Sequence, residues 1–147
     1  MRASLPHRDI TQATIGCFFR VYAELGYGLP EPHYASALAL ELSDCGLGVR
    51  REYPIDVRYR GRRIGQLRAD VIVAECVLLE LKAGPKLDPF ALRQLYNYLR
   101  CSELEVGLLL YFGPEPLIRR LDCPNHLKGT ASSRHEPRPR PWKGEEE

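Results

Sequence analysis

The sequence predicts a mixed α/β protein with one domain and one central sheet. Apolar side chains recur every three or four residues in two segments near the N-terminus, which is the period of a helix face. Between residues 49 and 82 the period changes to two, as in a strand. A third helical segment and a last apolar run follow. The predicted order is therefore α-α-β-β-β-α-β, in which an antiparallel meander leads to a helix and a final strand.

The two N-terminal segments are predicted helices. The first places four apolar residues on one face: Ile15, Phe18, Tyr22 and Leu25. In the second, Pro32 suits the first helical position because its missing N–H would be unpaired there anyway. This places Glu31 at or next to the N-cap, and Gly46 ends the helix. Three residues of this helix are expected to face inward: Tyr34, Leu38 and Leu42.

The strands and the third helix follow. Ile55, Val57 and Tyr59 alternate with polar residues, and the dipeptide "RG" then turns the chain. A second strand is predicted over 67–73 and a third over 77–82, where "VLL" is typical of a central strand buried on both faces. In "LDPFALRQLYNYLRCS", an aspartate caps a helix whose inward face comprises Phe90, Leu95 and Leu99. The run "LEVGLLLYFG" is then one more buried strand.

Composition limits the class of protein. The chain has 147 residues, of which 44% are hydrophobic and 27% charged, as is usual for a globular domain. Its net charge of only +2 indicates neither a nucleic-acid nor a membrane partner. No apolar run reaches the roughly 20 residues that span a bilayer. Its 5 cysteines contain no C-x-x-C pair, which predicts reduced thiols and a cytoplasmic protein. We expect one domain over residues 1–121 and a disordered, Pro-rich tail over 122–147.

Charged residues interrupt the predicted strands in "LRADVIVAECVLLELKAG". Glu80 and Lys82 have even spacing and so face the same side of their strand. A hairpin that turns near residues 74–76 would bring Asp70 alongside Glu80. Two adjacent carboxylates repel each other unless a cation such as Mg²⁺ or Mn²⁺ neutralises them. Lys82 could then serve a phosphate or orient an attacking water.

The alternative is that these charges form ordinary ion pairs on a solvated sheet face, with Arg68 as one partner. For any single residue this outcome is the commoner one. The set favours a site, because Glu80 and Lys82 directly follow the apolar residues of the strand expected to be most buried. Burying a charge without a partner is costly.

The pattern D-x₉-E-x-K resembles the PD-(D/E)xK nuclease superfamily. The predicted element order also fits that superfamily's α/β restriction-endonuclease-like αβββαβ core with a mixed sheet, preceded here by an extra N-terminal helix. Within it, "GLPEPHY" followed by "ALALEL" is similar to the signature of the small bacterial GxxExxY proteins. The likeness covers about residues 9–121 and includes "YRGRRIGQLRAD", "LELKA" and "QLYNYL".

The resemblance implies Mg²⁺- or Mn²⁺-dependent hydrolysis of phosphodiester bonds, with DNA as the substrate. It implies that Asp70 and Glu80 hold the metal, together with the Leu81 carbonyl and with Glu31 from the helix, and that Lys82 acts on the water. A simple helix cap explains Glu31 almost as well, and Pro30 and Pro32 depart from what relatives usually place beside it.

Gln94 and Tyr98 match the Q-x-x-x-Y element of RecB-like members of the superfamily, where it helps to hold substrate near the lysine. The polar edge of an ordinary amphipathic helix would explain this pair equally well. Seven arginines occur in the hairpin region: Arg50, Arg51, Arg58, Arg60, Arg62, Arg63 and Arg68. Three of them, Arg60, Arg62 and Arg63, lie at its tip. They could bind backbone phosphates, or they could keep an exposed strand edge from pairing with another chain.

Two alternatives to an enzyme stay open. One is a catalytically inactive nuclease-fold module that binds nucleic acid, and the other is an interaction protein that docks a partner on its sheet. A binding module would have no use for Asp70 and Glu80, which repel phosphate. A core of 121 residues leaves little room for a sequence-reading element. This favours a homodimer or a partner protein for work on a defined target.

Overall fold

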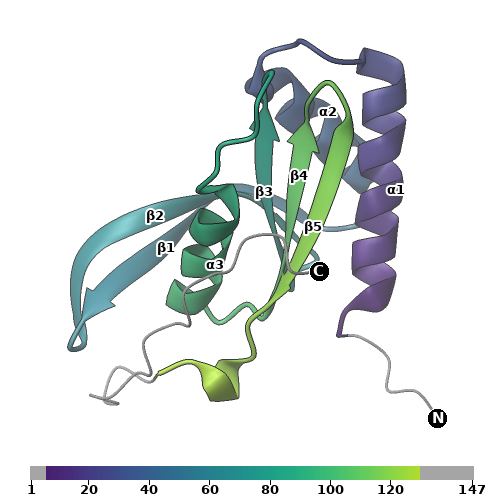
Figure 1. Ribbon diagram of the computed structural model, residues 1–147. Coiled ribbons are helices and arrows are strands. Elements are labelled where there is room, and N and C mark those ends of the chain that lie inside the picture. Colours follow the sequence, from purple (N-terminus) through teal and green to yellow (C-terminus); the bar gives the residue numbers. More distant parts are fainter. Residues whose placement is uncertain (1–5, 130–147) are drawn as a thin grey trace.

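A five-stranded sheet of order β1-β2-β3-β4-β5 runs through the protein (Figure 1). The structure is a computed structural model, and it describes residues 6–129. The strands are β1 (Val49–Tyr59), β2 (Arg62–Val73), β3 (Val77–Ala83), β4 (Val106–Phe112) and β5 (Pro116–Asp122). The helices are α1 (Arg8–Leu25), α2 (Glu31–Asp44) and α3 (Ala91–Cys101), followed by the short 3₁₀ helix η1 (Asn125–Leu127). Only the β3–β4 pair is parallel, so the predicted mixed sheet and α/β class are confirmed.

Helices cover both faces of the sheet, α1 and α2 on one side and α3 on the other (Figure 1). The α1/α2 layer buries Phe18 and Tyr34 against Phe112 of β4, whose ring stacks on Tyr34 with centroids 4.3 Å apart. On the other face, a Cβ at Gly107 of β4 would lie 2.7 Å from a methyl carbon of Leu95. Glycine therefore lets α3 pack directly on the sheet.

The first two helices follow the prediction with shifts at their edges. Leu25 is 37% exposed, so it does not belong to the buried face of α1. Compared with the predicted face, the buried face is shifted by about one residue toward the N-terminus. It is formed by Thr11, Thr14, Cys17, Phe18 and Val21. Helix α2 begins at Glu31, and Pro30 is its N-cap. The helix therefore starts one residue earlier than predicted from Pro32 as the first helical position. Gly46 follows with φ +82°, the left-handed conformation of a helix stop.

The β1–β2 hairpin is longer than predicted, and it projects from the body of the protein (Figure 1). Its strands pair from Val49↔Val73 out to Tyr59↔Arg62, and Arg60 and Gly61 form the turn with positive φ. The outer part of β2, residues 62–66, is largely exposed and lacks the apolar alternation that Ile55, Val57 and Tyr59 show in β1. Backbone pairing continues there without an apolar face.

The turn between β2 and β3 falls where the sequence predicts. Val71 pairs with Leu79 and Val73 with Val77, so the chain turns over residues 74–76. Ala74 and Glu75 take positive φ values of 50° and 59°, although neither is a glycine or asparagine. The register therefore places position 70 beside position 80 despite the unusual turn residues.

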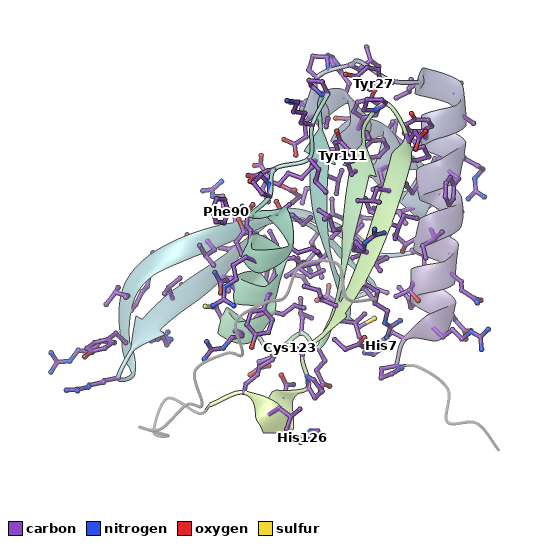
Figure 2. All side chains as sticks on the ribbon, in the orientation of Figure 1. His7, Tyr27, Phe90, Tyr111, Cys123 and His126 are labelled. Atoms are coloured by element: carbon purple, nitrogen blue, oxygen red, sulfur yellow. The ribbon has the colours of Figure 1, made fainter. Side chains whose placement is uncertain are left out.

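Three features of the second half differ from the prediction. Phe90 is 72% exposed and precedes α3 instead of lining its inner face, because the helix begins only at Ala91 (Figure 2). The edge strand β5 was not predicted. Residues 122–129, assigned to the tail from the sequence, contain η1 and the buried Cys123. The rest of the predicted tail, from residue 130, lies outside the described residues.

Within residues 6–129, no helix is both long and apolar enough to cross a membrane.

Candidate functional site

The three charged residues singled out in the strands lie on the α3 side of the sheet. Ile72 and Leu78 pair across β2 and β3 and belong to the core under α3. Glu80 and Lys82 are two and four residues from Leu78, so the alternation of β3 points both to this face. Asp70 lies close enough for its charge to act on Glu80. The structure therefore brings Asp70, Glu80 and Lys82 together as the sequence predicts.

Hydrogen bonds and charges tie this group to the strands. The Leu81 N–H donates to Asp70 Oδ2 at 2.8 Å, so the Asp70 side chain bridges β2 to β3 just beyond the last paired residues, Val71 and Leu79. Lys82 Nζ lies 3.5 Å from Glu80 Oε1. The Glu80 side chain is 4% exposed, and the Lys82 side chain is 22% exposed, so the ammonium can reach solvent or a ligand.

One oxygen of Glu80 has no partner. Among the described residues, Glu80 Oε2 is the buried side-chain oxygen or nitrogen that makes no hydrogen bond. A buried polar atom of this kind costs about 1–3 kcal/mol when it stays unpaired. A buried polar atom without a partner in a native protein needs an explanation, and one such explanation is that the atom binds an ion.

Burial raises the pKa of both carboxyl groups. Burial, reinforced by the charge of Asp70, raises the pKa of Glu80 to about 8, although Lys82 acts in the opposite direction. Burial also raises the pKa of Asp70, while the Leu81 N–H bond and the Lys82 ammonium act to lower it. Without a cation besides Lys82, the two carboxyl groups of Asp70 and Glu80 therefore keep one proton between them near neutral pH.

Helix α3 contributes two polar side chains to the same face. Gln94 Nε2 donates to the Tyr98 hydroxyl at 3.0 Å, so the two residues form one unit. Burial raises the pKa of Tyr98, with the charges of Glu80 and Asp70 adding to the effect. Tyr98 is therefore close enough to the acidic pair for their fields to act on it.

Glu31 reaches the group from the start of α2. Burial raises its pKa, the Asp70 charge adds to this rise, and the Lys82 ammonium opposes it. The loop before Glu31 is held by Tyr34, whose hydroxyl donates to the Gly26 carbonyl at 2.6 Å and accepts from the Leu29 N–H at 3.1 Å. Pro30 and Pro32 therefore leave Glu31 in the helix, near the other two acids.

The donor set fits a hard divalent cation. Glu31, Asp70 and Glu80 would carry three negative charges against the one positive charge of Lys82, an excess of two. Carboxylate oxygens are the ligands that Mg²⁺ and Mn²⁺ prefer. Within residues 6–129 these three carboxylates are not all within 4.8 Å of one another. The unpaired Glu80 oxygen supplies the observation that a cation would account for.

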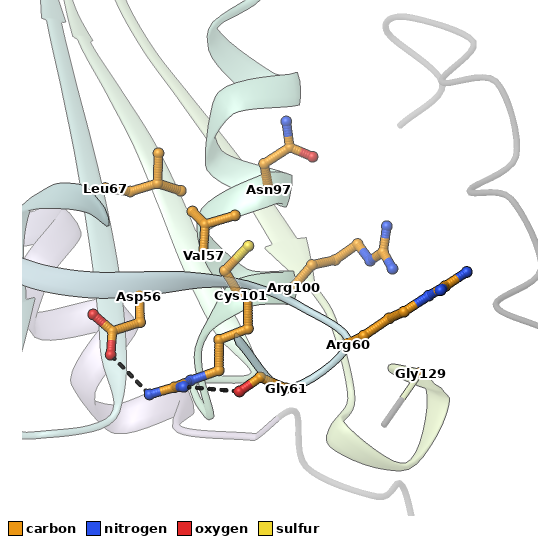
Figure 3. Close-up of a pocket in the computed structure, with 10 residues that line it drawn as sticks. Asp56, Val57, Arg60, Gly61, Leu67, Asn97, Arg100, Cys101 and Gly129 are labelled. Atoms are coloured by element: carbon orange, nitrogen blue, oxygen red, sulfur yellow. Dashed lines mark hydrogen bonds and ion pairs between the residues drawn. The ribbon is translucent and has the colours of Figure 1, made fainter. Parts of the chain in front are cut away.

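A hollow of about 590 Å³ lies between the β1–β2 hairpin and α3 (Figure 3). Ten residues line it: Asp56, Val57, Arg58, Arg60, Gly61, Leu67, Asn97, Arg100, Cys101 and Gly129. Arg58 is fixed by Asp56 and by the Gly61 carbonyl, at 3.1 and 3.3 Å. Arg60 lies over the Tyr59 ring at the exposed tip of the hairpin.

The hollow and the acidic group share helix α3, which contributes Asn97 and Arg100 to the lining of the hollow and carries Gln94 and Tyr98 as well. Sequence analysis missed Asn97 and Arg100. Asn97 lies three residues beyond Gln94 and Arg100 three beyond Asn97, and this helical spacing puts each such pair on neighbouring surface.

Comparison with known proteins gives one family. A family model described as the PD-(D/E)XK nuclease superfamily matches residues 8–121, from the start of α1 almost to the end of β5. No curated protein and no solved structure matches the chain.

Proposed function

The chain belongs to the PD-(D/E)XK nuclease superfamily, and we propose that it is a nuclease that hydrolyses phosphodiester bonds of DNA with Mg²⁺ or Mn²⁺ as its cofactor. The observation that carries this proposal is the buried, unpaired Glu80 oxygen beside a second carboxylate and an ammonium. A surface with a merely structural role would have no use for so costly an arrangement.

The residues that would hold the ion are Asp70 and Glu80, with the Leu81 carbonyl as a backbone ligand and Glu31 as an outer one. When bound, a divalent ion supplies positive charge that lowers the pKa of a ligated water and offsets charge on a phosphate. The raised pKa values of Asp70 and Glu80 belong to the protein without an ion, and a cation between them would reverse the direction of both shifts.

The other residues of the group have proposed roles that follow from their positions. Lys82 is tied to Glu80 and partly exposed, so it can hold an attacking water or face the oxygens of a phosphate. Gln94 and Tyr98 are joined by a hydrogen bond on the helix that covers this face, and we assign them to positioning Lys82 or the substrate strand.

Within the superfamily we assign the chain to the GxxExxY proteins. Gly28 has φ +110°, which favours glycine, and the Tyr34 hydroxyl bonds the loop on both sides of it. These two residues set the path of the chain that leads into Glu31, which gives the three-residue signature a physical purpose. A cytoplasmic setting, supported by the free thiols among the described residues, and a dimer or partner protein complete the proposal.

The hollow between the hairpin and α3 is the proposed path for the nucleic-acid strand that flanks the scissile bond. Asn97 and Arg100 of its lining belong to the same helix as Gln94 and Tyr98, so one strand that follows α3 would contact both the hollow and the acidic group. Arginine suits this surface because its planar guanidinium binds phosphate oxygens in pairs.

Incubation with plasmid and single-stranded DNA tests the proposed function. We expect cleavage in Mg²⁺ or Mn²⁺, none in EDTA, and a loss of cleavage in Asp70→Asn, which keeps the shape of the side chain but removes its charge. Cleavage that persists in EDTA or in Asp70→Asn would contradict the proposal. A salt-sensitive mobility shift without cleavage would identify a binding module instead.

The variant Arg60→Ala tests the proposed strand path. If Arg60 contacts a phosphate, its loss should lower the slope of log K against log salt concentration by about 0.9 on duplex DNA. Arg8→Ala is the matched control, because it removes the same charge from the start of α1, in the layer opposite α3. Equal slopes for the two variants would exclude a specific contact of Arg60 with the backbone.

A further inference from the structure

A second cluster of polar side chains joins α1 to α2, on the side of the sheet opposite α3. Cys17 Sγ and Cys45 Sγ lie 3.7 Å apart. The Arg20 guanidinium donates to both sulfurs, at 3.2 and 3.3 Å, and its Nε is paired with Glu41 at 3.1 Å. Cys17 is buried and Cys45 is exposed. The proposed nuclease chemistry uses none of these four residues.

We propose that Cys17 and Cys45 are a reversible redox pair that closes to a disulfide when the protein meets a peroxide. The two sulfurs are already in contact, and a disulfide requires them to approach from 3.7 Å to about 2.05 Å, with an adjustment of the two side chains. Disulfides in a reducing compartment are typically transient and redox-sensing, which suits a pair that is reduced at rest.

A metal site is the competing interpretation of the same atoms. Both sulfurs and a Glu41 oxygen lie within 4.8 Å of one another, which is close enough to share an ion. The Arg20 guanidinium, however, already donates to both sulfurs and to Glu41. A cation would have to displace this fixed positive charge, whereas a disulfide needs only the two sulfurs. The geometry therefore favours the disulfide.

The accessibility of the two thiols sets the order of the reaction. Cys45 is exposed, and its thiolate, beside the Arg20 charge, attacks one oxygen of hydrogen peroxide to give a sulfenic acid and hydroxide. The Cys17 thiol then attacks the Cys45 sulfur, and water leaves as the S–S bond forms. Two thiols lose two electrons and two protons, and one peroxide is reduced to two waters.

Cys17 fits the second role better than the first. Burial, together with its contact to Cys45, raises the pKa of the Cys17 thiol to about 11, so it stays protonated until an electrophilic sulfur forms beside it. The short distance then makes attack on Cys45 an intramolecular step.

The disulfide would lock the two helices together. Cys17 lies in the middle of α1, and Cys45 is the residue that caps the C-terminal end of α2. A bond between them closes a loop that contains residues 18–44 and so restricts the unfolded chain. For a domain of this size we expect a rise in melting temperature of about 5–10 °C on oxidation.

Treatment of the reduced full-length protein with hydrogen peroxide tests the proposal. We expect the intact mass to fall by two hydrogens, peptide mapping to join Cys17 to Cys45, the melting temperature to rise, and dithiothreitol to reverse all three changes. Cys45→Ser should lose the mass change and the shift. Cys101→Ser, which removes another exposed thiol, should keep both.

Other results would overturn the proposal. Oxidation of Cys45 to sulfinic acid without a crosslink, or a crosslink to a different cysteine, would exclude the pair. A rise in the melting temperature of the reduced protein with zinc chloride, lost in Cys45→Ser, would establish the metal site instead. None of these readouts uses nuclease activity, so the two proposals can fail separately.

Discussion

Lys82→Ala is expected to lower the rate of phosphodiester hydrolysis by about 10²–10⁴-fold, the usual contribution of a group that holds or moves a proton at the reacting water. Lys82 is the ammonium next to the acidic pair, 3.5 Å from Glu80. The loss should appear in kcat at saturating metal, because Lys82 is not a proposed metal ligand. Single-turnover cleavage of a labelled oligonucleotide measures it.

The matched control is Lys86→Ala, which removes the same charge from an exposed residue in the loop after β3. It should retain activity within a few-fold of the wild type. A melting curve of each variant shows whether the fold survives, which matters because Lys82→Ala leaves Glu80 without its ion pair. Equal activity of the two variants would remove Lys82 from the mechanism.

Glu80→Gln is expected to abolish metal-dependent cleavage and, without metal, to make the protein more stable than the wild type at alkaline pH. Glutamine has the size and neutrality of the protonated acid. It therefore avoids placing a second negative charge beside Asp70 in a site where the side chain is only 4% exposed. A substitution that inactivates and stabilises at once is typical of a strained functional group.

The pH dependence follows from the raised pKa of Glu80. In the unfolded chain the carboxyl ionises near its ordinary value of 4.5, whereas in the folded protein it holds its proton up to about pH 8. Between these values the folded state binds more protons, so the stability it confers is full below pH 4.5 and is lost as pH rises through about 8. The steepest loss is on the order of 1 kcal/mol per pH unit.

Urea unfolding in EDTA at several pH values checks this prediction. The free energies of unfolding of the wild type and Glu80→Gln should diverge as pH increases from 5 to 9. A smaller slope should persist in Glu80→Gln, because the pKa values of Asp70 and Glu31 are also raised. Parallel curves would mean that Glu80 is not the group that titrates.

The acidic group was predictable because its signal is local. Alternation within a strand and the register of one hairpin suffice to bring Asp70, Glu80 and Lys82 to one face, and the structure places them there. The unpaired Glu80 oxygen and the bond from the Leu81 N–H to Asp70 were not predictable, since both depend on side-chain conformations that a residue pattern does not specify.

The parts that sequence analysis missed lie where burial is incomplete. The outer part of β2, residues 62–66, is largely exposed, and the edge strand β5 is only half-buried and contains two arginines, so neither shows a clear apolar period. Phe90 was predicted to lie inside because an aromatic residue fitted the helical spacing. The turn fixed by Asp88, whose side chain accepts from the Phe90 N–H at 2.8 Å, precedes the helix, which starts at Ala91, two residues later than predicted.

The central claim is that Asp70 and Glu80 together form a binding site for a divalent ion. Calorimetric titration of the purified protein with Mn²⁺ at pH 8 tests it most directly. The account predicts that the wild type binds Mn²⁺ and that Asp70→Asn and Glu80→Gln each weaken binding by at least about tenfold, as the loss of one charged ligand should. Arg8→Ala should bind like the wild type. An absence of binding heat in the wild type, or equal affinity in all four proteins, would contradict the account.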